Sequence, residues 1–222
     1  GSIIPISTEK GKIVDNFETY IAVYMNTERA SFAEVGEEVS LRIGSDEVVD
    51  VAKDFQGKNV THIQGWGFSS VETDANGMPT MQGKEDTTLK EVILPDTIVE
   101  LGGTGFFYRE ALEKVRLPKN ITSIPSSCFR FCESLKSIEI PENVTSISTL
   151  AFAECSSLES IKIPNGVIII GDSAFIRCTS LKSIDIPSSV TSIHEDAFDY
   201  SGLTTINIKK VENSISGAPW GA

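Results

Sequence analysis

Four cysteines and two histidines are the side chains of this sequence whose types suit nucleophilic or metal chemistry. Cys132, Cys155 and Cys178 follow one another at intervals of 23 residues, and Cys128 precedes the first of them. A tetrahedral metal site needs ligands that converge on one point, whereas equal intervals of this length spread the thiols along a line. We therefore expect no metal. We interpret the cysteines as buried, reduced thiols that pack like small hydrophobic side chains, with a disulfide as the open alternative.

His62 and His194 are the candidate general bases, and they lie toward opposite ends of the part of the chain that repeats. A nucleophile works only with a base within hydrogen-bond reach, so the sequence offers almost nothing from which to assemble a catalytic pair. We predict that the chain is not an enzyme, that it has no catalytic residues and that it binds no cofactor.

The net charge of -12 narrows the classes of partner further. Nucleic acid and an anionic membrane would both repel such a chain unless basic residues were gathered in a stripe, and the sequence has no such stripe. No apolar run approaches the roughly 18 residues of a membrane span, so membrane attachment is expected only through a removed or missing anchor. The chain opens with Gly1-Ser2 and no signal-like segment, from which we expect a processed or truncated protein that has lost its export signal.

The elements that position these residues come from an internal repeat. A pattern of Leu-x-x-Ile/Val-x-Ile/Leu-Pro recurs every 23 residues, and columns of Val/Ile, Ile/Leu and Phe keep the same interval. A unit of this size cannot bury its own apolar side chains, so the units must stack and turn each column into a continuous inner ladder. The copies are Leu89–Pro95, Leu112–Pro118, Leu135–Pro141, Leu158–Pro164 and Leu181–Pro187, with a shorter sixth copy at Leu203–Ile208.

We predict an α/β solenoid in which each unit gives one strand of a parallel sheet and returns through a turn and a short helical segment. Residues 60–68 match the columns of a first coil, and an inserted loop follows at 69–88. Upstream, alternating apolar and polar residues predict a small antiparallel β cap over the N-terminal edge. The predicted domains are therefore the cap at 1–58 and the solenoid at 59–222.

The order Leu-x-Ser-Ile-x-Ile-Pro, Val-Thr-Ser-Ile and Ala-Phe-x-x-Cys-x-Ser-Leu, complete within residues 135–158, resembles the BspA-type leucine-rich repeat of bacterial surface proteins. The resemblance covers about residues 89–208. It implies a leucine-rich-repeat fold and an exported protein, extracellular or at the cell surface and often a lipoprotein. It also implies adhesion to host proteins or other cells, and it carries over no catalytic residue.

Two columns of charged residues are expected on the outer face of the parallel sheet, with signs that alternate from one unit to the next. Opposite charges side by side predict ion pairs between neighbouring strands, each worth a few tenths of a kcal/mol. These pairs would fix the stacking register, and the same polar face also suits the binding of a polar protein or glycan surface. The columns are Lys90, Glu113, Lys136, Glu159 and Lys182, and Arg116, Glu139, Lys162 and Asp185.

Departures from the repeat are better candidates for partner contacts than consensus residues, which already have a structural role. Ile93 replaces a polar residue of the outer column, Ile168 and Ile169 replace Thr-Ser, and Tyr108 and Phe131 are adjacent in a further column. Exposed apolar groups of this kind anchor interfaces.

The leading hypothesis is a non-catalytic recognition or adhesion module that binds a protein or glycan on a host or neighbouring cell. The alternative is a structural spacer that displays or separates other domains and has no ligand of its own. The candidate partner-binding residues are Ile93, Lys90, Arg116, Glu139, Lys162, Asp185, Tyr108, Phe131, Ile168 and Ile169.

Overall fold

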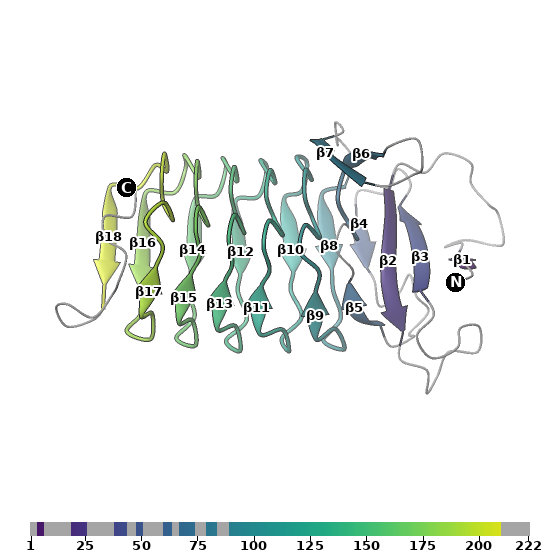
Figure 1. Ribbon diagram of the computed structural model, residues 1–222, viewed down its shortest axis with the longest axis horizontal. Coiled ribbons are helices and arrows are strands. Elements are labelled where there is room, and N and C mark those ends of the chain that lie inside the picture. The colour runs from purple at the N-terminus through teal and green to yellow at the C-terminus, as the bar shows by residue number, and fades with distance from the viewer. Residues whose placement is uncertain are drawn as a thin grey trace.

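The computed structural model describes residues 4–6, 19–25, 38–43, 48–50, 60–63, 67–73, 79–83 and 89–209. Residues 89–209 wind into a solenoid of successive coils, each formed by one unit of the repeat (Figure 1). Each complete coil contributes two short strands, and the paired strands of neighbouring coils run parallel. The predicted parallel solenoid is therefore confirmed.

The first strand of each coil follows the leucine that opens the repeat, and we call these the front strands. They are β8 (Glu91–Ile93), β10 (Lys114–Arg116), β12 (Ser137–Glu139), β14 (Ser160–Lys162), β16 (Ser183–Ile186) and β18 (Thr205–Ile208). The second strand follows the proline turn, and we call these the back strands. They are β9 (Glu100–Leu101), β11 (Ser123–Ile124), β13 (Ser146–Ile147), β15 (Ile169–Ile170) and β17 (Ser192–Ile193).

Alternation within a front strand separates the core from solvent. In β10 the β-branched Val115 is buried, whereas Lys114 and Arg116 on either side of it are exposed. A β-branched residue favours the extended backbone, and the proline that follows ends the pairing because it has no N–H to donate. The consensus thus sets both the length of the strand and the side chains that it presents.

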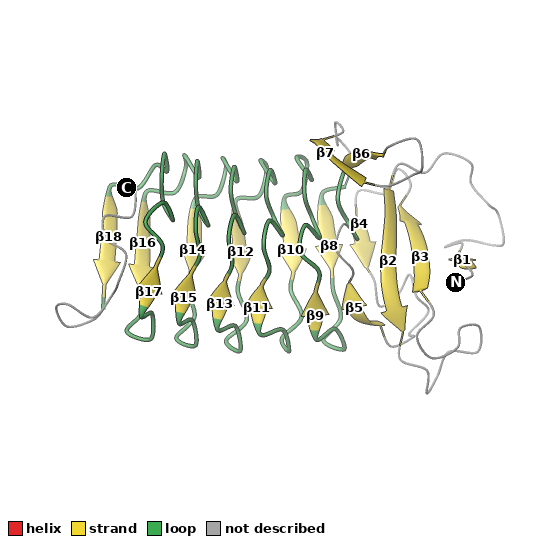
Figure 2. Cartoon of the chain, in the orientation of Figure 1, coloured by secondary structure: helices red, strands yellow, loops and turns green. Residues whose placement is uncertain are grey.

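The short helical segment that the sequence predicts after each back strand is absent, and this prediction is wrong: within the described ranges the chain forms turns and no helix (Figure 2). Two residues in the segment of one coil, Ser127 and Phe131, have left-handed backbone with φ of 55° and 64°. A helix requires consecutive right-handed residues, so each left-handed residue stops the local turn.

Contacts between coils explain why these segments prefer turns. Within the segment, the Cys128 N–H donates to the Pro125 carbonyl, as in a single turn, at 3.3 Å. The next N–H, that of Phe129, donates instead to the carbonyl of Ala151 in the following coil at 2.8 Å. Alternate N–H groups therefore bond along the solenoid axis, and a continuous helix would direct all of them along its own axis.

Phenylalanine forms the most continuous ladder of the core. Neighbouring rings are nearly parallel, and their centroids are 4.9–5.6 Å apart, an offset-stacked arrangement that aromatic pairs favour. All the rings are buried, so each coil is held to the next by apolar contact as well as by backbone hydrogen bonds. The stack consists of Phe68, Phe106, Phe129, Phe152, Phe175 and Phe198.

The four cysteines are buried and free. In three successive coils the thiols of Cys132, Cys155 and Cys178 donate to the carbonyl of a core phenylalanine in the preceding coil, over 3.1–3.2 Å. Arg109 occupies the same column, and its Nε donates to the carbonyl of Phe68. The column is thus a line of side-chain donors that satisfies one buried carbonyl in each coil, which is a structural role.

The position of Phe68 in the stack locates the first coil and the inserted segment. Successive phenylalanines of the stack are 23 residues apart, but Phe68 and Phe106 are separated by 106 − 68 = 38 residues and still stack at 4.9 Å. The difference is the inserted segment, which the sequence predicts as a loop. Its described residues form a hairpin of β6 (Val71–Thr73) and β7 (Pro79–Gly83), which lies at the upper edge of the first coils (Figure 1).

The N-terminal strands join the solenoid through backbone pairing. They are β1 (Ile4–Ile6), β2 (Thr19–Met25), β3 (Glu38–Ile43), β4 (Val48–Asp50) and β5 (Val60–Ile63). β2 pairs antiparallel with β3 and β5, whereas β1 pairs parallel with β3 and β4 pairs parallel with β8. The sheet that contains β1, β3, β2 and β5 has both parallel and antiparallel pairs, so the antiparallel cap is not confirmed. The domain boundary at residue 58 stays a prediction.

Leu158 tests the stacking of the coils. This side chain is fully buried, so Leu158→Ala should lower the free energy of unfolding by about 2–5 kcal/mol, because it opens a cavity in the middle of the stack. Urea unfolding followed by circular dichroism measures the change. The neighbouring exposed substitution, Glu159→Ala, should stay close to the parent; equal effects of the two substitutions would contradict the assignment of the leucine column to the core.

Cys178 gives a prediction for alkaline pH. Burial raises the pKa of its thiol from 9.0 to about 12. The unfolded chain loses this proton at lower pH than the folded chain, so the stabilisation is complete below about pH 9 and is lost as the pH rises toward about 12. Between these values, the urea midpoint of the parent should fall more steeply than that of Cys178→Ala. Parallel curves would show that the folded thiol ionises normally.

Candidate binding surfaces

The outward side chains of the front strands form a polar surface, which we call the sheet face. In β14, for example, Ile161 points inward and is buried, whereas Ser160 and Lys162 are exposed. The predicted contact residues on or beside this face are Lys90, Ile93, Arg116, Glu139, Lys162 and Asp185. The last four are exposed, whereas Lys90 and Ile93 are half-buried. Ile93 is partly covered because β4 extends the sheet beside it, with Asp50 in register.

The ion pairs of the sheet face depart from the predicted lateral pattern. Arg116 pairs with Asp96 in the preceding coil, with 3.0 Å between Nη2 and Oδ2, and not with Glu139 on the next front strand. The guanidinium also donates to the carbonyl of Leu94 at the end of β8, which holds it beside Asp96. The side chain therefore follows the hydrogen bonds available at the strand end and not the charge that is opposite it in the column.

Lys162 and Asp185 show the same behaviour. Lys162 Nζ lies 2.9 Å from Oε1 of Glu142, which follows the proline of the preceding coil. Lys209, beyond the last front strand, lies 3.2 Å from Asp185. Interaction along the column is therefore seen only in part. Asp185 accepts a hydrogen bond at 2.9 Å from Asn207, its register partner on β18, and Glu139 lies in register with Lys162, but the ion pairs themselves are made with partners beyond the strand ends.

Hydrogen bonds at these exposed pairs shift the pKa values of their members. The backbone N–H of Lys119, followed by the guanidinium of Arg116, lowers the pKa of Asp96. The hydrogen bond to Glu142 raises the pKa of Lys162. Both shifts favour the charged forms of Asp96 and Lys162, and salt screens these pairs because they are open to solvent.

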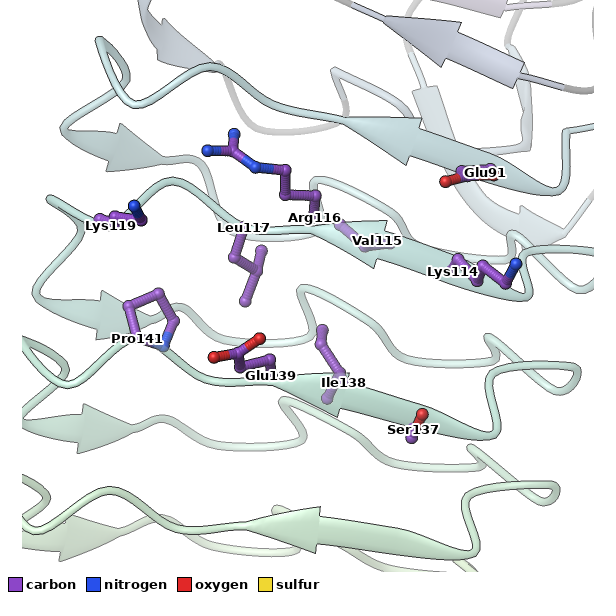
Figure 3. A pocket seen from close by; sticks show the side chains of 10 residues that line it. All are labelled: Glu91, Lys114, Val115, Arg116, Leu117, Lys119, Ser137, Ile138, Glu139 and Pro141. Atoms are coloured by element: carbon purple, nitrogen blue, oxygen red, sulfur yellow. The ribbon is translucent and has the colours of Figure 1, made fainter.

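A hollow of about 390 Å³ opens in the sheet face at β10 and β12, and we call it the seam hollow (Figure 3). These strands pair with β8 and β14 respectively and not with each other, so the backbone ladder is interrupted between them. Nearly buried apolar side chains form its floor, and charged residues stand at its rim. The lining residues are Val115, Leu117, Ile138, Pro141, Lys114, Arg116, Lys119, Glu91, Glu139 and Ser137.

A second surface lies beside the β6–β7 hairpin, and we call Phe107, Tyr108, Arg130 and Phe131 the aromatic–arginine cluster. The predicted neighbours Tyr108 and Phe131 stack with 4.2 Å between ring centroids and 11° between planes. The Arg130 guanidinium carbon lies 4.8 Å from the centroid of Phe131 and 5.7 Å from that of Phe107. On the hairpin side, a Cβ at Gly83 would collide with the ring of Tyr108, so this ring packs directly on the hairpin backbone.

Ile168 and Ile169 lie on the opposite side of the coil from the sheet face, at β15, and are 45% and 43% exposed. In the neighbouring coils, Thr145 and Thr191 occupy the position of Ile168, and their hydroxyls donate to a carbonyl of the preceding coil. Isoleucine cannot make that bond. The substitution therefore gives up a hydrogen bond between coils and exposes apolar surface without a visible gain in packing.

The predicted contact residues thus fall on three separate surfaces: the sheet face, the aromatic–arginine cluster and the two isoleucines. Sequence reasoning missed Arg130, although its column also holds Phe107 and Ile176. It also missed Tyr200, the most exposed large hydrophobic side chain of those described, at 68%. The signal for Tyr200 was present, because it occupies the column of Tyr108 and Phe131.

The described residues contain no arrangement that points to metal or membrane chemistry. Among them, no three His, Cys, Asp or Glu side chains are grouped so that they could hold a metal ion. His62 lies beside Glu100, with 3.7 Å between Nε2 and Oε2, while His194 belongs to a coil near the other end of the solenoid. In the same ranges, no helix has the length and apolar character to cross a membrane.

Comparisons with known structures place the fold. The chain is similar to a leucine-rich repeat protein of T. pallidum, with a TM-score of 0.65 and 24% identity over 77% of this chain and 74% of that one. It is also similar to a leucine-rich repeat protein from Eubacterium ventriosum, with a TM-score of 0.58 and 20% identity over 91% of this chain and 59% of that one. The chain spans about three fifths of this second relative. At these identities the likeness concerns the fold.

The sequence comparisons identify the repeat. A comparison with curated proteins gave no match. The family model of the BspA-type leucine-rich repeat region matches residues 84–160 and 103–218, in six copies. Neither this description nor the names of the two similar structures indicate a catalytic function. Since the matched residues make up more than half of the sequence and coincide with the observed coils, the chain belongs to the BspA-type leucine-rich repeat family.

Proposed function

We propose that the chain is a non-catalytic recognition module, extracellular or exposed at the cell surface, which binds a protein or glycan partner through the sheet face. The repeat supplies a scaffold in which each coil is held by backbone and aromatic contacts to its neighbours. A scaffold of this kind holds surface residues in fixed positions before a partner arrives, which reduces the entropy lost on binding. The resemblance of the repeat to that of bacterial surface proteins supports export.

The seam hollow is the observation that carries this proposal. Its volume of about 390 Å³ lies within the range of ligand pockets, about 300–1,000 Å³. Its floor includes Val115 and Ile138, which are nearly buried and keep 8% and 6% of their surface exposed. A hollow with an apolar floor and a polar rim offers both the buried contact and the oriented hydrogen bonds that recognition requires.

The charges at the rim favour a polar partner of low net charge. Among the described residues, Lys114 and Glu139 at the rim have no hydrogen-bonded partner of opposite sign, while Arg116 is already bound to Asp96. Cations and anions are thus mixed within one hollow, in contrast to the chain as a whole, whose net charge is -12. A protein loop or a glycan with several hydroxyl groups suits this rim better than a strongly charged polymer.

A bulky side chain placed in the seam hollow tests the proposal. Ser137 lines the hollow and is exposed, so Ser137→Trp should fill it without disturbing the core. Ser183 is the equivalent exposed residue of β16, and Ser183→Trp is the matched control. In a solid-phase screen against extracellular-matrix proteins and complex glycans, we expect the parent and Ser183→Trp to bind alike and Ser137→Trp to bind at least about tenfold more weakly.

The outcomes separate the competing functions. Equal binding by both tryptophan variants would remove the seam hollow from the site. Absence of binding by the parent across the screen would favour the alternative, a spacer that separates other domains. Thermal unfolding of all three proteins is the control for folding, because a solenoid coil that opened around the new side chain would lower the melting temperature.

A further inference from the structure

Arg130 in the aromatic–arginine cluster differs from two exposed arginines of the solenoid, Arg116 and Arg177. Arg116 and Arg177 each have a carboxylate within ion-pair distance, 3.0 Å to Asp96 and 3.4 Å to Glu154. The guanidinium of Arg130 has no such carboxylate among the described residues, and its buried Nε finds no acceptor there. Its contacts are with the rings of Phe107 and Phe131.

This environment favours the binding of an anion by the guanidinium of Arg130. The side chain is half-buried, and its aromatic neighbours exclude water on one side without neutralising the charge. A carboxylate that approached from solvent would form a charge-assisted hydrogen bond in surroundings where such bonds are stronger than in water. Contacts with two rings also restrict the guanidinium, so less side-chain entropy would be lost on binding.

The arrangement of the rings decides which kind of partner fits. A sugar ring binds to aromatic side chains through a free ring face. Here Tyr108 is already in contact with the Gly83 backbone and with Phe131, and Phe131 is in contact with Tyr108 and Arg130. These contacts reduce the ring face on which a sugar could stack, so we take the ring edges as the surface offered to a partner. Ring edges suit apolar side chains, which favours a protein segment over a glycan.

The β6–β7 hairpin lies beside the cluster and bounds it on one side. Ahead of the hairpin, the N–H of Phe68 donates to the carbonyl of Gly105 at 2.6 Å, and the N–H of Ser70 donates to that of Phe107 at 2.8 Å. At its end, Gly83 lies against Tyr108. The hairpin is therefore joined to the first coils at both of its ends. These contacts fix its position relative to the guanidinium of Arg130.

We propose that Arg130 anchors a second docking site, in which the carboxylate of an acidic segment of a protein partner binds the guanidinium while adjacent apolar side chains contact the edges of Tyr108 and Phe131. This inference rests on the proposed recognition function and assigns it a partner class. The site lies apart from the seam hollow and uses none of its lining residues. The segment is short, because the cluster spans two neighbouring coils.

A library of random twelve-residue peptides printed on an array tests this site, with an array of neutral and acidic glycans as the second probe. The labelled chain should retain peptides enriched in Asp and Glu beside apolar residues. Arg130→Gln should reduce that retention at least about tenfold, as expected for the loss of a charge-assisted hydrogen bond. Arg130→Lys should retain part of it, because the charge stays and the planar fork is lost.

Arg177→Gln is the matched control, since Arg177 lies 5.7 Å over the ring of Tyr200 but is already paired with Glu154. Its peptide profile should match that of the parent, and thermal unfolding should show that every variant is folded. Retention by Arg130→Gln equal to that of the parent would overturn the site, as would binding of acidic glycans alone; in both cases the recognition function would stand. Failure to bind either array would count against both proposals.

Discussion

Contact between successive coils is the interaction on which the rest of this molecule depends. A single coil has no interior: its leucine, isoleucine and phenylalanine side chains are buried only because another coil lies on each side. The same neighbour satisfies the backbone, since the Phe129 N–H finds its acceptor at Ala151 in the next coil. The left-handed residues of the turn segments, each a local cost of about 1–2 kcal/mol, are stable for this reason.

This constraint also determines where a partner can be recognised. Consensus residues already bond to a neighbouring coil, as do Thr145 with its hydroxyl and Cys155 with its thiol. Changes at such positions would disturb the stack. Changes of residue are tolerated where a side chain points away from the core or where an inserted segment extends from a coil. The seam hollow, Ile168 and the β6–β7 hairpin occur at such places.

Electrostatic interactions are secondary to these contacts between coils. The chain as a whole carries a large negative net charge, yet cations on the sheet face are drawn into local pairs such as Arg116 with Asp96. These pairs are exposed and contribute less to stability than to the orientation of side chains around the seam hollow. Arg130 is different because aromatic rings hold it, so its charge is available to an outside group while its position is fixed.

The sequence by itself determined which residues share a layer. Equal spacing defined the coils and the Phe stack. The longer interval from Phe68 to Leu89 than from Phe152 to Leu158 indicated the insertion, because each coil needs one phenylalanine and one leucine in their columns whatever the local backbone does. It also placed Tyr108 beside Phe131. Only the tertiary structure decided how each layer is built: turns in place of helices, a hairpin in the insertion, an interrupted ladder beside β12 and Asp96 as the partner of Arg116. Periodicity reports the column of a residue, whereas hydrogen bonds to the next coil and the reach of long side chains depend on positions in space.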